Sequence, residues 1–168
     1  MNRTITNRSM NISSNYNKNS NIVNVAIVDD NEKILENIND ALAKDSSIKV
    51  VGKAKNGEEG YELIRKTNPD VVILDLIMPK MDGLSLMDKI HNEGSLIKTP
   101  FFIITSAISN ESVIQDAFGF GAGYYMLKPF EMDMIIDRVK GVKSYNKRIP
   151  ENKKFIDAGE DRKQFMDR

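Results

Sequence analysis

Residues 71–83 read VVILDLIMPKMDG, and this stretch decides the fold. Its four leading apolar residues, three of them β-branched, are typical of a strand buried inside a sheet. Asp75 ends the run, Pro79 interrupts any regular element, and Asp82-Gly83 is a turn or helix-entry signal. We therefore expect Asp75 at the carboxyl end of a central strand, where open α/β sheets bind ligands. A carboxylate there can bind a hard cation or attack phosphorus as a nucleophile.

The rest of the chain alternates between strand-like apolar runs and segments with helical apolar spacing. Five such alternations predict a parallel sheet covered by helices on both faces. Short connections with right-handed crossovers favour a doubly wound α/β sandwich. The expected strands are residues 23–28, 48–54, 71–74, 101–104 and 124–127, and the expected helices begin near residues 31, 57, 82, 110 and 132.

Glycines and methionines in the last third of the chain add local expectations. Gly119, Gly121 and Gly123 are expected to end the fourth helix together. Met126 and Met134 are expected to lie mostly in the core.

Composition divides the chain into three parts. Residues 1–21 are rich in Asn and Ser and are expected to form a disordered N-terminal extension. Residues 22–145 are expected to form the one folded domain. Residues 146–168 hold too few apolar side chains for a second core, so they are expected to be a linker or tail, or one weak helix.

Charge is unevenly distributed, although the formal net charge is zero. Residues 1–24 hold three basic and no acidic side chains, and residues 145–168 hold seven basic and five acidic ones. The segment between them therefore carries a net charge of −5. An acidic central domain argues against nucleic-acid binding by that domain.

Residue usage excludes several classes of site. The chain has no cysteine, which excludes disulfides and thiolate metal sites. Its one histidine, His91, is expected at the exposed end of a helix, without the two-helix hairpin that a phosphorylatable histidine needs. No apolar run approaches the ~18 residues of a membrane span, and no secretory signal is visible. We therefore expect a soluble cytoplasmic protein with no membrane partner.

Polar side chains follow four of the expected strands. These are Asp29 and Asp30, Asp75, Thr105 and Ser106, and Lys128. The carboxyl ends of parallel strands share one edge, where three carboxylates repel one another unless a cation is present. Oxygen ligands without His or Cys suit a hard ion such as Mg²⁺. Lys128 could pair with a phosphoryl oxygen, and the Thr105 hydroxyl could donate to another.

Each of these signals alone also has a structural interpretation. Paired aspartates after a strand are often a helix cap, a threonine there is usually structural, and Lys-Pro is usually a surface turn. An unpaired buried carboxylate at Asp75 is harder to explain in that way, because it is costly. The presence of all four signals in this order along the chain favours a functional site.

These residues resemble the response-regulator receiver domains of two-component and phosphorelay systems, over roughly residues 23–145. Asp30, Asp75, Thr105 and Lys128 are separated by 45, 30 and 23 residues, similar to the family pattern. The resemblance implies a flavodoxin-like fold with five parallel strands in the order 2-1-3-4-5 and five helices.

The resemblance also implies a role for each site residue. Asp75 accepts a phosphoryl group from a histidine kinase or a histidine phosphotransfer protein. Asp30, Asp75 and the backbone carbonyl of Ile77 bind Mg²⁺ directly, and Asp29 binds it through water. Lys128 pairs with the phosphoryl group, and its bond to Pro129 is expected to be cis.

Three further residues are implied to act as a switch. Thr105 contacts the phosphoryl oxygen, and Tyr125 matches an aromatic side chain that turns inward on activation. Ser106 stands where the family commonly has alanine. The face formed by the fourth helix, fifth strand and fifth helix is then expected to dimerise or to regulate an output. The chain is expected to be no enzyme beyond its own phosphorylation and slow dephosphorylation.

Within the family, residues 123–132 look similar to the receiver of the sporulation-initiation transcription regulator of spore-forming Firmicutes. That regulator carries a C-terminal DNA-binding domain, whereas no helix-turn-helix pattern precedes Arg168. We therefore expect no direct nucleic-acid binding by this chain, which is either a receiver cut from a longer protein or one that works alone.

Two other functions are weighed against this one. Phosphohydrolases of the haloacid-dehalogenase type also use an aspartyl nucleophile, but they need a second aspartate where this chain has Ile77. A pure interaction module that is never phosphorylated would be favoured by the loss of an acid or the lysine, and all are present.

Overall fold

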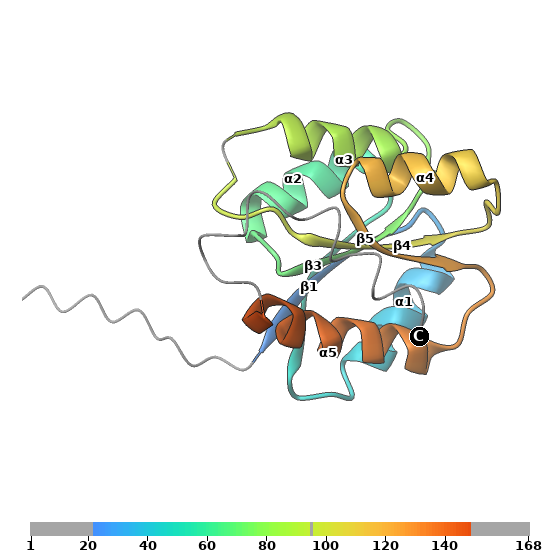
Figure 1. Ribbon diagram of the computed structural model, residues 1–168. Helices are drawn as coiled ribbons and strands as arrows, with labels where there is room; N and C mark the ends of the chain where they lie inside the picture. Colours follow the sequence, from blue (N-terminus) through green and yellow to red (C-terminus); the bar gives the residue numbers. More distant parts are fainter. Residues whose placement is uncertain (1–21, 95, 149–168) are drawn as a thin grey trace, which may run out of the picture.

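The computed structural model describes residues 22–94 and 96–148, which form a three-layer α/β sandwich (Figure 1). Five parallel strands make one sheet in the order β2-β1-β3-β4-β5. The strands are β1 (Val23–Val28), β2 (Ile48–Ala54), β3 (Val71–Asp75), β4 (Phe101–Ser106) and β5 (Ala122–Leu127). The expected flavodoxin-like fold, with its strand order, is confirmed.

Helices cover both faces of the sheet (Figure 1). On one face lie α1 (Glu32–Leu42) and α5 (Met132–Arg148), and on the other α2 (Gly57–Thr67), α3 (Gly83–Asn92) and α4 (Glu111–Gly119). Alternate strand residues therefore enter two separate cores. This double burial explains why β3 is apolar at every position before Asp75 and why all five of its residues are buried.

Polar side chains fix where four of the helices begin. The side-chain oxygens of the N-cap residues accept backbone N–H groups of the first turn; these residues are Asn31, Asn56, Asp82 and Asn110. All four capped helices follow strands that end at the same sheet edge, so short loops join that edge to well-defined helix starts.

Two expectations about the last third of the chain are wrong. Gly119 and Gly121 lie at the end of α4, but Gly123 lies inside β5, where the ring of Phe101 occupies the space that a side chain would need. Met126 is buried as expected, whereas Met134 is 44% exposed, because it lies off the stripe of α5 that faces the core. His91 is exposed, as expected.

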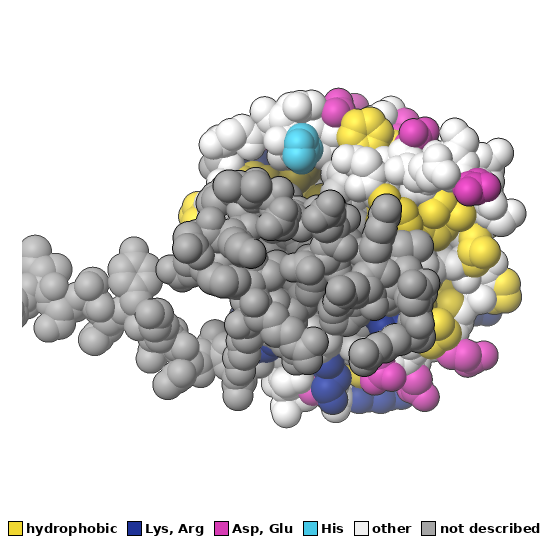
Figure 2. All heavy atoms as spheres, in the orientation of Figure 1, with side chains coloured by type: hydrophobic (Ala, Val, Ile, Leu, Met, Phe, Trp, Pro, Cys, Tyr) yellow, Lys and Arg dark blue, Asp and Glu magenta, His cyan; other side chains and the backbone are white. Residues whose placement is uncertain are grey.

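The face formed by α4, β5 and α5 carries exposed apolar side chains. Figure 2 shows a band of them between the two helices. Leu127 of β5 and Met134 of α5 are among the exposed large apolar residues of the described chain.

The domain boundaries remain predictions. Residues 1–21, expected to be disordered, and residues 149–168 of the expected tail lie outside the described residues. The expected boundary at residue 145 falls inside α5, which continues to Arg148. None of the described helices is both long and apolar enough to cross a bilayer.

We expect Gly123→Ala to lower the free energy of unfolding by about 1–3 kcal/mol, because the new methyl group overlaps the Phe101 ring in a packed core. Urea denaturation measures the change. Gly141→Ala is the control, since a Cβ there would have no heavy atom of the described residues within 4 Å, apart from its chain neighbours and the backbone of its own helix. In the middle of α5 it should raise stability by about 0.5–1 kcal/mol. Equal effects of the two substitutions would contradict the packing argument.

Candidate functional site

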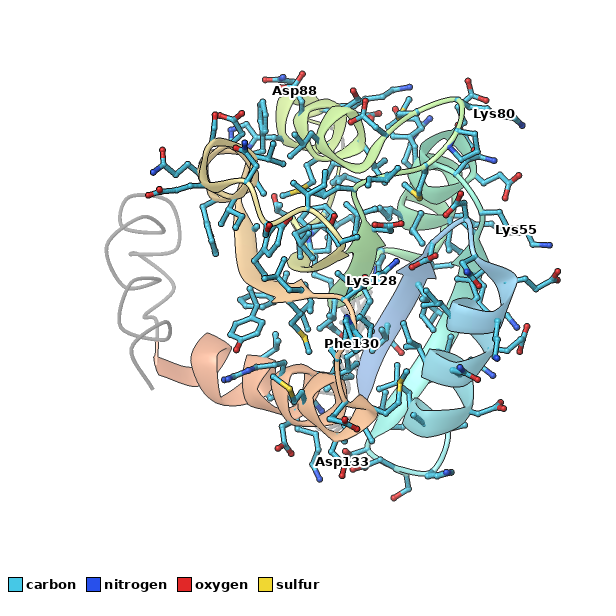
Figure 3. All side chains as sticks on the ribbon, turned by 90° about the vertical axis from the view of Figure 1, so that its right-hand side faces the viewer. Lys55, Lys80, Asp88, Lys128, Phe130 and Asp133 are labelled. Carbon is cyan, nitrogen blue, oxygen red and sulfur yellow. The ribbon has the colours of Figure 1, made fainter. Side chains whose placement is uncertain are left out.

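The carboxyl ends of the strands bring every polar residue singled out by the sequence to one edge of the sheet. The strands are parallel, with Asp75 opposite Thr105 and Ser106 opposite Leu127. Figure 3 faces this edge and places Lys128 near its centre. The edge therefore holds both acidic and basic groups from distant parts of the chain.

Three carboxylates form a cluster at this edge. Asp29, Asp30 and Asp75 each offer an oxygen, and these oxygens lie within 4.8 Å of one another. Asp29 and Asp75 are only 1% and 5% exposed, whereas Asp30 is open to solvent. All three donors are hard oxygen ligands at a partly open position, which fits a Mg²⁺-sized cation with its retained water.

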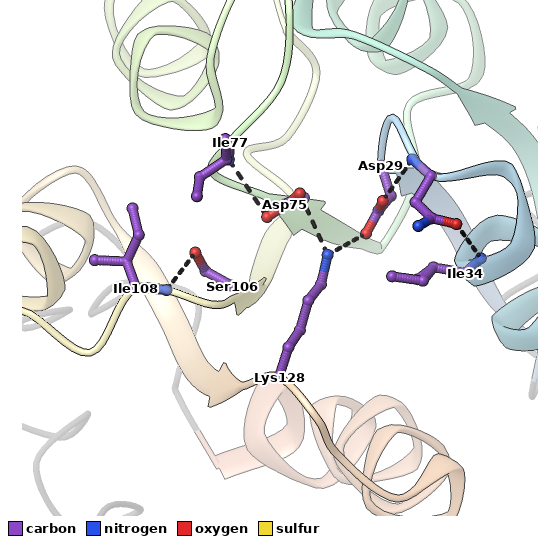
Figure 4. Close-up of polar contacts among 8 residues, drawn as sticks. Asp29, Ile34, Asp75, Ile77, Ser106, Ile108 and Lys128 are labelled. Atoms are coloured by element: carbon purple, nitrogen blue, oxygen red, sulfur yellow. Dashed lines mark hydrogen bonds and ion pairs between the residues drawn. The ribbon is translucent and has the colours of Figure 1, made fainter.

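Lys128 links two of the carboxylates. Its Nζ lies 2.7 Å from Asp29 Oδ2 and 3.2 Å from Asp75 Oδ2, and its side chain is 18% exposed (Figure 4). The Lys128 N–H donates to the Ser106 carbonyl at 2.9 Å, and the bond to Pro129 is cis, as expected. The ammonium thus offsets part of the negative charge that the fold gathers here.

The environment of Asp75 disfavours its charged form. Burial raises the pKa of the Asp75 carboxyl above its usual range, and the nearby Asp29 charge adds to this effect. The Lys128 charge and the Ile77 N–H, which donates to Asp75 Oδ1 at 3.3 Å, act in the opposite direction. A bound cation would therefore stabilise the carboxylate form of Asp75.

The two hydroxyl residues at the end of β4 lie on opposite faces of the sheet. Ile73 and Ile103 pack with α1 and α5, so strand alternation places Asp75 and Thr105 on that face as well. Ser106 lies on the other face, where Tyr125 also packs. The Thr105 hydroxyl is buried and has no hydrogen-bond partner among the residues that the structure describes. This hydroxyl lies on the strand next to Asp75, and the described residues offer it no hydrogen-bond acceptor.

Ser106 and Tyr125 both hold Ile108, in the loop between β4 and α4 (Figure 4 draws the Ser106 contact). The Ile108 N–H donates to Ser106 Oγ at 3.2 Å, and the Tyr125 hydroxyl donates to the Ile108 carbonyl at 2.8 Å. Sequence reasoning missed Ile108, because its backbone makes both contacts and a backbone group leaves no signal in the residue type.

Ile77, whose carbonyl is expected to bind the metal, contacts Asp75 through its backbone N–H. It is the second residue after Asp75, and its side chain is 54% exposed beside the acidic cluster. The loop after β3 therefore places a backbone group and a carboxylate of the same short segment at one edge.

Comparison with known proteins agrees with this fold and arrangement. The family described as response regulator receiver domain matches residues 25–140. The signal receiver domain of NarL from Mycobacterium tuberculosis is 30% identical, with a TM-score of 0.66, over 73% of this chain and 97% of that chain.

Two other solved structures are similar. The REC domain of the response regulator AraT from Geobacillus stearothermophilus is 28% identical, with a TM-score of 0.64, over 76% of this chain and 99% of that chain. A chain of the CheX–CheY complex with BeF3 and magnesium from Borrelia burgdorferi is 28% identical, with a TM-score of 0.64, over 72% of this chain and 89% of that chain. From its fold, its strand-edge residues and these matches, this chain belongs to the family of response regulator receiver domains.

Proposed function

We propose that this chain is a phosphorylation-switched signalling module whose acceptor is Asp75. A carboxylate oxygen of Asp75 attacks the phosphorus of a phosphohistidine on a histidine kinase or a histidine phosphotransfer protein. The P–O bond forms while the P–N bond breaks, and the electron pair leaves with the imidazole, which takes up a proton. The module performs only this step and slow hydrolysis of its own phosphoaspartate.

The observation that carries the proposal is the unpartnered Thr105 hydroxyl on the strand beside Asp75. A buried hydroxyl without a partner costs about 1–3 kcal/mol. A phosphoryl group on Asp75 would supply the missing acceptor on the same face of the sheet. Lys128, already within 3.2 Å of Asp75, would pair with another phosphoryl oxygen.

We further propose that Asp29, Asp30, Asp75 and the Ile77 carbonyl hold Mg²⁺. The hard-oxygen donor set supports this, as does the magnesium in the similar Borrelia complex. When bound, the ion supplies positive charge against the phosphoryl oxygens. Asp29 and Lys128 hold each other in place, and Asp30 remains open to solvent, where an ion could enter.

The switch in this proposal passes through Ile108. If Thr105 moves toward a phosphoryl group, the end of β4 moves with it, and Ser106 and Tyr125 both hold the loop that follows. The α4–β5–α5 face would then be reshaped for dimerisation or for docking an output. Exposed Leu127 and Met134 on this face support such a role.

The process that the module regulates, its cellular location and its domain boundaries are proposed from fewer observations. Similarity of residues 123–132 to the sporulation-initiation regulator supports a role in sporulation-type transcription control. We propose a cytoplasmic module with a receiver over residues 22–145, flanked by an extension over 1–21 and a linker over 146–168. The acidic balance of the central domain supports signalling to protein partners rather than direct binding of nucleic acid.

Incubation with acetyl phosphate and Mg²⁺ is expected to add one phosphoryl group to the intact protein, measured by mass spectrometry. Asp75→Asn should add none, and chelation of Mg²⁺ should suppress the gain. A gain that persists in Asp75→Asn would move the acceptor to another residue. Failure with both acetyl phosphate and a phosphorylated partner protein would leave a pure interaction module as the better explanation.

Thr105→Val and Ser106→Ala should have opposite effects on the unphosphorylated protein. Valine removes a buried hydroxyl that has no partner, so stability should rise by about 1 kcal/mol. Ser106→Ala loses the acceptor for the Ile108 N–H, so stability should fall by about 0.5–1.5 kcal/mol. Urea denaturation measures both changes.

The same pair of variants tests the switch. Phosphorylation should shift the Ile108 amide resonance in wild type and Ser106→Ala, but much less in Thr105→Val. The reverse pattern, with the response lost only in Ser106→Ala, would contradict a switch that depends on the Thr105 hydroxyl.

Asp75→Asn is also expected to stabilise the metal-free protein at neutral pH. Folding raises the pKa of Asp75, so the stability of wild type falls as pH rises from the ordinary value of 3.8 through the raised pKa. Asparagine does not titrate, so its advantage should vanish below pH 3.8. Denaturation in a chelator across this range measures the difference. An advantage that is the same at all pH values would contradict the pKa shift as its cause.

A further inference from the structure

The loop between β3 and α3 (residues 76–82) is held by two backbone hydrogen bonds from glycines. The Gly83 N–H donates to the Leu76 carbonyl at 3.0 Å and closes the loop on itself. The Gly57 N–H donates to the Met81 carbonyl at 2.9 Å and comes from outside the loop. Gly57 is the first residue of α2, a helix that contributes no side chain to the acidic cluster.

The start of α2 is itself closely fixed. Buried Asn56 accepts the Glu59 N–H through Oδ1 at 3.0 Å and donates through Nδ2 to Glu59 Oε1 at 2.9 Å. Glu59 Oε2 accepts the Lys55 N–H at 3.0 Å. These bonds hold the pKa of the Glu59 carboxyl below its usual range, the Lys55 N–H contributing most. Gly57 therefore lies at a well-ordered helix N-terminus.

Gly57 has no room for a side chain. A Cβ there would overlap the Met81 carbonyl oxygen first, and the Met81 side chain lies almost as near, with Cγ at 2.7 Å. A flexible side chain could turn away, but a backbone carbonyl can retreat only if the loop moves. The close approach of α2 to this loop thus depends on glycine.

A shift at Met81 would pass along the loop toward the acidic cluster. The Met81 N–H donates to the Pro79 carbonyl at 2.8 Å, and Lys80 between them has a left-handed backbone with φ 65°. This tight turn ties Met81 to Pro79, which lies two residues after Ile77. The Ile77 N–H bond to Asp75 Oδ1 is already long at 3.3 Å, so a small displacement would break it.

We propose that Gly57 is a positioning residue for the phosphoacceptor site. By lacking a side chain and by donating its N–H to Met81, it sets where the loop presents the Ile77 backbone beside Asp75. The metal-binding part of this inference rests on the proposed function, in which the Ile77 carbonyl binds Mg²⁺. The placement of the loop in the metal-free protein does not rest on it.

Gly60, on the same helix, provides a matched control. A Cβ at Gly60 would also be crowded, at 2.9 Å from Val28 Cγ1 and 3.1 Å from Leu86 Cδ2. Those atoms belong to core side chains and not to the loop. Gly57→Ala and Gly60→Ala should therefore both lower stability, but only the first should move the loop.

The test compares Mg²⁺ binding by wild type, Gly57→Ala and Gly60→Ala, with Kd taken from amide shifts in a magnesium titration. Gly57→Ala should weaken Mg²⁺ binding by about tenfold. This is the lower end of the loss of metal affinity seen when a residue that orients a metal ligand is changed. Gly60→Ala should stay near the wild-type Kd. In chelator, the Ile77 amide resonance should move in Gly57→Ala and stay in place in Gly60→Ala.

An Ile77 resonance unmoved in metal-free Gly57→Ala would overturn the proposal, as would equal losses of Mg²⁺ affinity in both variants. If Gly57→Ala does not fold, the wild-type protein provides the test. Its Gly57 amide resonance should shift during the Mg²⁺ titration with the same midpoint as that of Ile77. A Gly57 resonance that does not shift would overturn the inference. If wild type binds no Mg²⁺, the proposed function fails, and the Ile77 comparison in chelator still decides the positioning role.

Discussion

The Lys128 ammonium, held between Asp29 and Asp75, is the interaction on which the site depends. These three residues come from the ends of β1, β3 and β5, and β4 lies between the last two. Without a cation, the repulsion and desolvation of two buried carboxylates at this edge would oppose folding or favour protonation of one of them. The strand order brings the lysine across β4, and the lysine in turn makes the acidic edge compatible with a folded chain.

Backbone groups form part of the site together with the charged side chains. Ile77 and Ile108 are ordinary apolar residues, yet the first contacts Asp75 through its N–H and the second joins Ser106 to Tyr125 through both of its backbone groups. Their positions are set by loops tied to neighbouring helices and strands. The site is therefore a property of how the loops are anchored as much as of the residues that carry charge.

Sequence patterns predicted the parallel sheet and the acidic edge because both follow from local signals, whereas the strand order was implied by the resemblance to a known family. Apolar runs ending in Asp, Thr-Ser or Lys mark strand ends, and parallel strands must share an edge. The position of Gly123 could not be predicted, because the Phe101 ring that requires it comes from a neighbouring strand. The exposure of Met134 depends on which stripe of α5 meets the sheet, and apolar residues on two sides of that helix leave the choice open.

The unbroken length of α5 separates two regions of the molecule. Its 17 residues span about 26 Å at 1.5 Å per residue. The helix begins four residues after Lys128 and runs back along the sheet, so Arg148 lies at the opposite pole from the acidic cluster (Figure 1). A molecule docking at one pole would not obstruct a protein bound at the other. The acidic edge and the far end of α5 can therefore contact different molecules at the same time.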